Sequence, residues 1–272
     1  MKAPGFGTWR THAQAPAELF SKLAEEDRQG ISAVQAGTVS VNPCTAYAML
    51  KGWIGGGYSG KRIGEGDWFV QNGANSGVGR AAIQLGKAWG LKSLNVIRAR
   101  PGGEEETNAL KKELNSLGAN VVVTEEEAQD KEFGERVKEW TNGGREEIGL
   151  ALNCVGGRSA LSLAKVLGRG GWHVTYGAMA KQPLTLPAGI LIFSDLRFAG
   201  FWVSEWSKRE PTEKENAVKE VLRMTREGSF KDVPVQEIKW DWETREDILK
   251  EAIQGTLEGF RGGKGVFVFG ET

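Results

Sequence analysis

The fold is decided by one glycine-rich stretch of ten residues, Gln71 to Arg80, which reads QNGANSGVGR. It follows a short apolar run and precedes a helical pattern, whose inner face is marked by Val78, Ala81, Ala82, Leu85 and Trp89. Glycines let the backbone approach a pyrophosphate closely, and the N-terminus of the next helix offers unpaired N–H groups and the positive end of its dipole. The A-x-x-G-x-G spacing alone also fits an ordinary turn, but its place between a strand and a helix predicts a phosphate-binding loop.

Apolar runs alternate with helical patterns downstream of this loop. Six strands are expected, at 67–72, 93–98, 121–123, 148–155, 171–176 and 196–203, and helices at 78–89, 108–117, 130–140 and 159–167 separate the first five. Short connections and near-continuous apolar strands are typical of a parallel sheet covered by helices on both faces. The predicted fold class is therefore α/β, with a doubly wound parallel Rossmann sheet.

The sequence before and after the expected sheet shows a less regular pattern of apolar residues. Before the loop, the sequence predicts a short helix near 17–26, a helix with Asn42 as its N-cap and Pro43 as its first residue, and a glycine loop at 55–60. After the sixth strand, a charged helix is expected at 212–227. Residues 236–272 then predict a strand, a helix, a glycine turn and a terminal strand at 265–269.

The second expected strand ends in two arginines. Arg98 stands 19 residues after Gly79, followed by Ala99 and Arg100, and no acidic residue occurs from position 90 to 103. In NAD-binding folds an acidic residue at about this spacing holds the ribose 2′-OH. A carboxylate would repel a 2′-phosphate, whereas a guanidinium pairs with it in a bidentate manner. The arginines therefore indicate NADPH, with a solvated basic strand end as the alternative.

Composition excludes several classes of protein. Lys plus Arg and Asp plus Glu each number 35, so the chain has no net charge to attract nucleic acid or an anionic membrane. No apolar run is long enough for a membrane span. Two cysteines, Cys44 and Cys154, and two histidines predict neither a disulfide framework nor a four-ligand zinc site. Residues 1–14 show neither the apolar core of a signal peptide nor a clear amphipathic transit helix.

Five motifs resemble the mitochondrial trans-2-enoyl-CoA (enoyl-acyl carrier protein) reductases of fungi and animals, in the medium-chain dehydrogenase/reductase superfamily. They are VNPCTAY at 41–47, the loop at 71–79, LNCVGG at 152–157, VTYGAMAKQP at 174–183 and GFWVS at 200–204. The resemblance runs from about residue 7 to the C-terminus. The related quinone oxidoreductases share the loop, but the YGAMAKQP run favours the enoyl reductases.

The resemblance implies a zinc-free oxidoreductase. Such an enzyme moves a hydride from NADPH to the β-carbon of an enoyl thioester on CoA or acyl carrier protein, and a tyrosine supplies the proton at the α-carbon. It also implies mitochondrial fatty acid synthesis, and mitochondrial localisation although no transit peptide is visible. A homodimer through the edge of the nucleotide-domain sheet is expected, with residues near 196–206 as candidates.

The same resemblance implies a set of cofactor contacts. The candidates are Asn42 on the nicotinamide side; Asn75, Ser76, Gly77 and Val78 at the pyrophosphate; Arg98 and Arg100 at the 2′-phosphate; Tyr176, Gly177, Ala178 and Met179 at the end of the fifth strand; Phe201, Trp202 and Val203 beside the nicotinamide and the substrate channel; and Lys264 near the C-terminal strand. Structural alternatives stay open for six of these positions. They are a helix cap (Asn42), core aromatics (Tyr176, Phe201, Trp202), plain packing (Met179) and an exposed turn charge (Lys264).

Most of the family's substrate domain, a GroES-like barrel, has no counterpart in this sequence, because the family motif Gly-Thr-Trp-Arg-Thr already stands at 7–11. We therefore expect a remnant of that domain at 1–40, the NADPH-binding Rossmann domain at 41–205, and a C-terminal helix with a return to the substrate domain at 206–272. An incomplete GroES-like β-domain made from both chain ends should then accompany the Rossmann sheet.

The family's proton-donating tyrosine matches none of Tyr47, Tyr58 and Tyr176, so the catalytic residue is unknown and weak or absent activity is expected. A partial sequence, a mispredicted gene start and a truncated paralogue would all look like this chain. Three functions stay open: a 2-enoyl thioester reductase, a non-catalytic NADPH-binding module and a quinone-reductase-like oxidoreductase.

Overall fold

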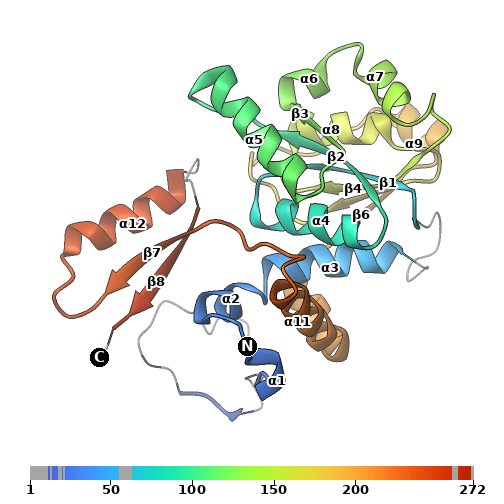
Figure 1. Cartoon of the computed structure of the whole chain (residues 1–272). Coiled ribbons are helices and arrows are strands. Elements are labelled where there is room, and N and C mark those ends of the chain that lie inside the picture. The colour runs from blue at the N-terminus through green and yellow to red at the C-terminus, as the bar shows by residue number, and fades with distance from the viewer. Residues whose placement is uncertain are drawn as a thin grey trace.

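The computed structural model describes residues 12, 14–17, 20, 22–54, 63–258 and 263–270. Its centre is a parallel sheet of six strands in the order β3-β2-β1-β4-β5-β6 (Figure 1). The strands are β1 (Trp68–Asn72), β2 (Lys92–Ile97), β3 (Val121–Thr124), β4 (Ile148–Asn153), β5 (Trp172–Thr175) and β6 (Arg197–Gly200). The order reverses between β1 and β4, which makes the sheet doubly wound and confirms the predicted Rossmann class.

Helices cover both faces of this sheet, because successive side chains of a strand point to opposite sides. Phe69 and Leu150 face a core shared with α4 (Gly77–Ala88), while Val70 and Ala151 face one shared with α6 (Glu125–Gln129), α7 (Phe133–Trp140) and α8 (Gly157–Val166). A third cluster joins α4 and β2 to α5 (Gly103–Leu117). Every residue of β1 and β4 is buried, as expected for a parallel sheet with two covered faces.

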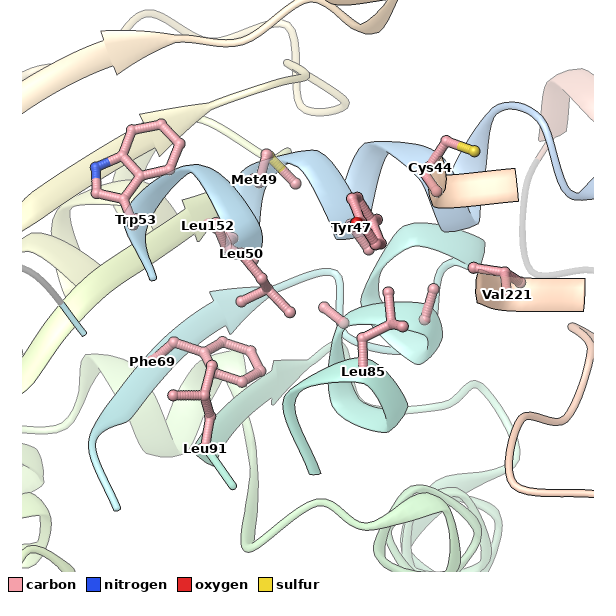
Figure 2. Packing of buried hydrophobic residues seen from close by; sticks show 14 of the residues in the cluster. Cys44, Tyr47, Met49, Leu50, Trp53, Phe69, Leu85, Leu91, Leu152 and Val221 are labelled. Atoms are coloured by element: carbon pink, nitrogen blue, oxygen red, sulfur yellow. The ribbon is translucent and has the colours of Figure 1, made fainter. Parts of the chain in front are cut away.

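A further helical layer lies against α4. Helix α3 (Asn42–Trp53) packs Leu50 toward β1 and α4, above Phe69 in Figure 2, and packs Trp53 against Trp172 of β5, with their ring centroids 5.8 Å apart. Helix α11 (Pro211–Arg226) lies on the outer side of α3 and adds Val221 to the same core. The start of α3 corrects the prediction for Asn42: the N-cap is Val41, whose carbonyl already accepts a hydrogen bond from Thr45 N at 2.8 Å, so Asn42 is itself helical.

Several predicted boundaries are wrong. Strand β6 ends at Gly200 rather than at Val203, because α10 (Val203–Arg209) begins there. The helix predicted at 130–140 begins only at Phe133, and a separate short helix, α6, precedes it. Helix α5 begins at Gly103, five residues early, and α9 (Ala188–Ser194) was not predicted.

The remaining elements lie at the two ends of the described chain. Two short helices, α1 (Glu25–Arg28) and α2 (Ala33–Thr38), precede α3. At the other end β7 (Val235–Trp240) and β8 (Lys264–Phe269) form a two-stranded parallel sheet connected through α12 (Glu246–Glu258), drawn to one side of the large sheet in Figure 1. The expectation of a β-domain made from both ends rests partly on residues 1–11, and the predicted glycine loop on 55–60; both lie outside the described residues. Across the described ranges no helix is both long and apolar enough to cross a membrane.

Candidate functional site

The phosphate loop connects β1 to α4 at the point where the strand order reverses. Gly73 has a φ of +59°, and Ser76 caps α4 by accepting a hydrogen bond on its side-chain oxygen from Gly79 N at 3.2 Å. A Cβ on Gly79 would lie 2.5 Å from the Ala74 carbonyl oxygen, and one on Gly73 would lie 2.6 Å from Cys154 Sγ. Both positions therefore require glycine, and the loop keeps its backbone free of side chains.

An ion pair between a largely buried arginine and a half-exposed glutamate fixes this loop against α5. Arg80 donates to both carboxylate oxygens of Glu113, at 2.7 and 2.9 Å, and its Nε donates to the Asn75 carbonyl at 3.1 Å. The hydrogen bond from Arg80 holds the pKa of Glu113 below its usual value. The sequence assigns no role to Arg80, although a basic residue directly after the last glycine of such a loop is a readable signal.

Asn42 lies beside the start of α4. A Cβ on Gly77 would fall 2.3 Å from Asn42 Nδ2, so the structure brings this side chain to the phosphate loop from a different helix. Asn75, Ser76, Gly77 and Val78 are all partly exposed here. This placement corrects the reading of Asn42 as a helix cap and is compatible with a ligand contact.

The end of β2 carries the two arginines. Arg98 is exposed, whereas the Arg100 side chain is mostly buried and its Nε lies 3.1 Å from Glu106 Oε1. The other oxygen of Glu106 accepts a hydrogen bond from Gly102 N at 2.9 Å. An acidic group therefore reaches Arg100 from the first turn of α5, although none occurs in the segment from 90 to 103.

The end of β5 places four further candidates near Cys154. Tyr176 packs against the core, and its buried hydroxyl lies beside the side chains of Cys154 and Ser76. Burial raises the pKa of the Tyr176 hydroxyl well above its usual value. A Cβ on Gly177 would lie 3.2 Å from Cys154 Cβ, whereas Ala178 is exposed and Met179 is 65% exposed. Met179 is therefore not a core side chain.

The three candidates after β6 take different environments. Phe201 packs against the core, with its ring centroid 6.3 Å from that of Trp206. Trp202 is 64% exposed, which excludes the reading as a core aromatic, and Val203 is the first residue of α10.

Lys264 stands apart from the candidates on the large sheet. It is the first residue of β8, is exposed, and donates its backbone N–H to the Pro234 carbonyl at 2.7 Å. Among the described residues no hydrogen bond or ion pair joins it to the phosphate loop.

Two buried asparagines at the same edge of the sheet have no role assigned by the sequence. Asn72 ends β1 and Asn153 ends β4, and Asn72 Nδ2 donates to Asn153 Oδ1 at 2.8 Å. Asn72 Nδ2 also lies 3.1 Å from Ser159 Oγ, and Asn72 Oδ1 accepts from Cys154 N at 2.8 Å. Asparagines at strand ends read as turn residues in a sequence, so no local signal reveals this contact.

Among the residues that the structure describes, no group of three or more His, Cys, Asp or Glu side chains is arranged to hold a metal ion. A shallow hollow of about 510 Å³, lined by residues such as Tyr47, Lys51 and Trp89, contains none of the candidate cofactor contacts. The convergent loops at the ends of β1, β2, β4 and β5 remain the best candidate site, as Rossmann sheets bind ligands at this edge.

Known proteins resemble this chain over most of its length. The model of the zinc-binding dehydrogenase family matches residues 77–224. A mitochondrial enoyl-(acyl-carrier-protein) reductase of Yarrowia lipolytica is 46% identical over 259 residues, which is 95% of this chain and 64% of the relative. The chain therefore spans slightly less than two thirds of that relative's length.

Solved structures agree with the sequence comparison. A mutant form of enoyl thioester reductase from Candida tropicalis superposes with a TM-score of 0.84 at 35% identity, covering 97% of this chain and 71% of that one. The Etr1p/NADP/crotonyl-CoA complex superposes with a TM-score of 0.76, also at 35% identity, covering 85% of this chain and 61% of that one.

Proposed function

Since the chain belongs to the family of the mitochondrial enoyl-(acyl-carrier-protein) reductases, within the zinc-binding dehydrogenases, we propose that it binds NADPH and serves the reduction of 2-enoyl thioesters to acyl thioesters. The observation that carries the proposal is the glycine loop at the switch point of the sheet. Its backbone is kept bare by close contacts at Gly73 and Gly79, where any side chain would collide with Cys154 or Ala74. We also propose that it acts in mitochondria, like its relatives.

The loop has the features that a pyrophosphate needs. The first N–H groups of α4 have no partner within the helix, and the helix dipole places partial positive charge beside Ser76 and Gly77. Asn42 adds an amide beside Gly77. The buried Tyr176 hydroxyl, at the end of β5, is a further polar group beside Ser76. These residues fit a dinucleotide laid across the ends of β1, β4 and β5.

The arginines at the end of β2 would hold the 2′-phosphate. Arg98 is exposed, so its guanidinium has room to pair with a phosphate in a bidentate manner. Arg100 would also bind the 2′-phosphate once its hydrogen bond to Glu106 is broken or shared. This arrangement favours NADPH over NADH.

NADPH, when bound, supplies the hydride that reduces the β-carbon of the enoyl thioester. Phe201, Trp202 and Val203 follow β6 and would border the nicotinamide and the thioester, with Trp202 offering its exposed ring. Of the tyrosines that the structure describes, Tyr47 is buried in α3 and the Tyr176 hydroxyl is buried at the core. A general acid must reach its substrate, so we assign the proton donor to neither.

An assay of NADPH oxidation with two acceptors tests this function. With the full chain, oxidation should depend on crotonyl-CoA and not on a quinone. Turnover of the quinone alone would contradict the proposal, and saturable NADPH binding with no turnover of either acceptor would favour the non-catalytic NADPH-binding module.

We further propose that the partner at the edge of the large sheet is a second copy of the chain. Strand β6 is an edge strand, and the neighbouring helix α9 exposes Leu191, Ile192 and Phe193. Exposed strand edges and contiguous apolar side chains are features of interaction sites. Light scattering should give a dimer for the chain and a monomer for Ile192→Glu; a monomeric unaltered chain would contradict this part of the proposal.

A further inference from the structure

Asn153 makes four hydrogen bonds although its side chain is completely buried. Its Oδ1 accepts from Asn72 Nδ2 at 2.8 Å, from Val155 N at 3.2 Å and from Gly156 N at 3.1 Å. Its Nδ2 lies 3.1 Å from Thr175 Oγ1, at the end of β5. Burying an amide costs free energy unless its polar atoms form hydrogen bonds. The Asn153 amide finds its partners at the end of β1, at the end of β5 and in the turn after β4.

The turn that Asn153 fixes supports the loop after β5. Gly156 and Gly157 have φ values of +91° and +54°, so the turn bends sharply after Val155. The carbonyl oxygens of Cys154 and Val155 then accept hydrogen bonds from Met179 N at 2.8 Å and Ala180 N at 2.9 Å. Gly156 also forms an isolated parallel bridge with Gln182. The 177–182 loop is therefore held by the residues that Asn153 positions.

A second partner of Asn153, Asn72, connects it to the phosphate loop. Asn72 is the residue directly before Gly73, and its Oδ1 accepts from Cys154 N at 2.8 Å. Cys154 Sγ lies 3.6 Å from the Asn72 carbonyl oxygen and blocks any side chain at Gly73. Buried contacts of Asn72 with Asn153 and with Cys154 thus connect the two loops.

We infer that Asn153 is a positioning residue that holds the phosphate loop and the 177–182 loop at the separation required by the two halves of one dinucleotide. The inference rests on the proposed function, in which these loops bind different parts of NADPH. When two sites bind linked groups, the gain from linkage depends on a fixed distance between them. The affinity of a ligand that binds only the phosphate loop and the arginines does not depend on the distance to the 177–182 loop.

The test compares NADPH with adenosine 2′,5′-bisphosphate, a fragment that lacks the nicotinamide half, by calorimetry on the full chain. Asn153→Ala should weaken NADPH binding about tenfold or more and weaken the fragment about threefold at most. Equal losses for both ligands would overturn the inference, because a merely structural residue would affect them alike. Absence of binding of either ligand to the unaltered chain would overturn the proposed function and the inference with it.

Two further variants keep the test decisive if Asn153→Ala folds poorly. Asn153→Asp keeps the oxygen that accepts the three N–H groups but adds a negative charge, so both ligands should lose affinity by the same factor. An excess loss of NADPH in this variant would contradict the inference. Ser159→Ala is the matched control: it removes one buried partner of Asn72 and leaves the Asn72–Asn153 contact, so the ratio of the two affinities should stay unchanged.

Discussion

The six-stranded sheet and the β7–β8 pair are both parallel, yet they bury their strands very differently. Every residue of β1 and β4 is buried, whereas no residue of β7 or β8 is. Trp242, in the connection from β7 to α12, is 86% exposed, and Ile248 and Ile253 of α12 are exposed as well. Parallel strands are ordinarily covered on both faces, so among the described residues the large sheet has a core on each face and the β7–β8 pair has none.

This difference places stability and the candidate cofactor site in the same part of the chain. The candidate cofactor contacts lie around the large sheet, with the exception of Lys264 on β8. If the large sheet is the stable unit, substitutions in it should affect both unfolding and NADPH binding, and substitutions in the β7–β8 pair should affect neither strongly.

The largest expected effect comes from removing a ring from the core of the large sheet. Phe69→Ala should lower the free energy of unfolding by about 4 kcal/mol, because Phe69 is completely buried between β1 and α4. The matched change in the small sheet, Phe267→Ala, should cost about 1 kcal/mol, since its residue is only partly buried. Urea unfolding of both variants measures the difference, and equal losses would contradict the contrast between the sheets.

A smaller effect is expected at the ion pair beneath the phosphate loop. Arg80→Met should destabilise the chain by about 2 kcal/mol, because it removes three charge-assisted hydrogen bonds of a largely buried guanidinium, two of them to the half-exposed Glu113. It should also weaken NADPH binding, because the Asn75 carbonyl in the phosphate loop loses its hydrogen bond from Arg80. Arg223→Met, which breaks exposed pairs on α11, is the control and should change neither the unfolding midpoint nor the affinity noticeably.

Acid should destabilise the large sheet through His173. This side chain is completely buried on β5, its Nε2 lies 3.2 Å from the Ala160 carbonyl, and burial lowers its pKa. The unfolded chain therefore binds the proton more readily, and stability should fall as the pH drops below about 6.5, by at most about 1.4 kcal/mol per pH unit. Denaturant midpoints between neutral and mildly acid pH should show a weaker decline in His173→Phe; an unchanged decline would assign the acid sensitivity elsewhere.

The smallest effect is expected at Glu106, at the rim of the large sheet. Its carboxylate binds Arg100 and Gly102 N, so Glu106→Gln should remove the negative charge that competes with the 2′-phosphate for Arg100 and tighten NADPH binding about threefold. NADH affinity should not change. Weaker NADPH binding in this variant would mean that Glu106 orients Arg100 for the 2′-phosphate instead of competing with it.

The sequence predicts the large sheet well because its signals are local. Apolar runs of strand length, short connections and the loop after β1 indicate the strands and their parallel arrangement. The sequence does not predict the polar helix α6, because its charged residues show little apolar periodicity, although Thr124 and Glu127 form a capping box. It does not predict helix α9 either, because that helix has no polar face.

The sequence predicts only those parts of the candidate site whose residues lie close together in the chain. The spacing of the glycines indicates the phosphate loop, and the distance from Gly79 to Arg98 indicates the arginines. The contact between Asn72 and Asn153 joins residues 81 positions apart, and its existence depends on how β1 and β4 pair. The pairing of Arg100 with Glu106 depends likewise on where α5 begins, which the sequence placed too late.

The most direct test of NADPH binding at the large sheet is a calorimetric titration of the full chain and of Arg98→Ala with NADPH and with NADH. The unaltered chain should bind NADPH about tenfold or more tightly than NADH, and Arg98→Ala should remove most of that preference. Absence of saturable binding, or equal losses of both affinities in Arg98→Ala, would contradict the assignment.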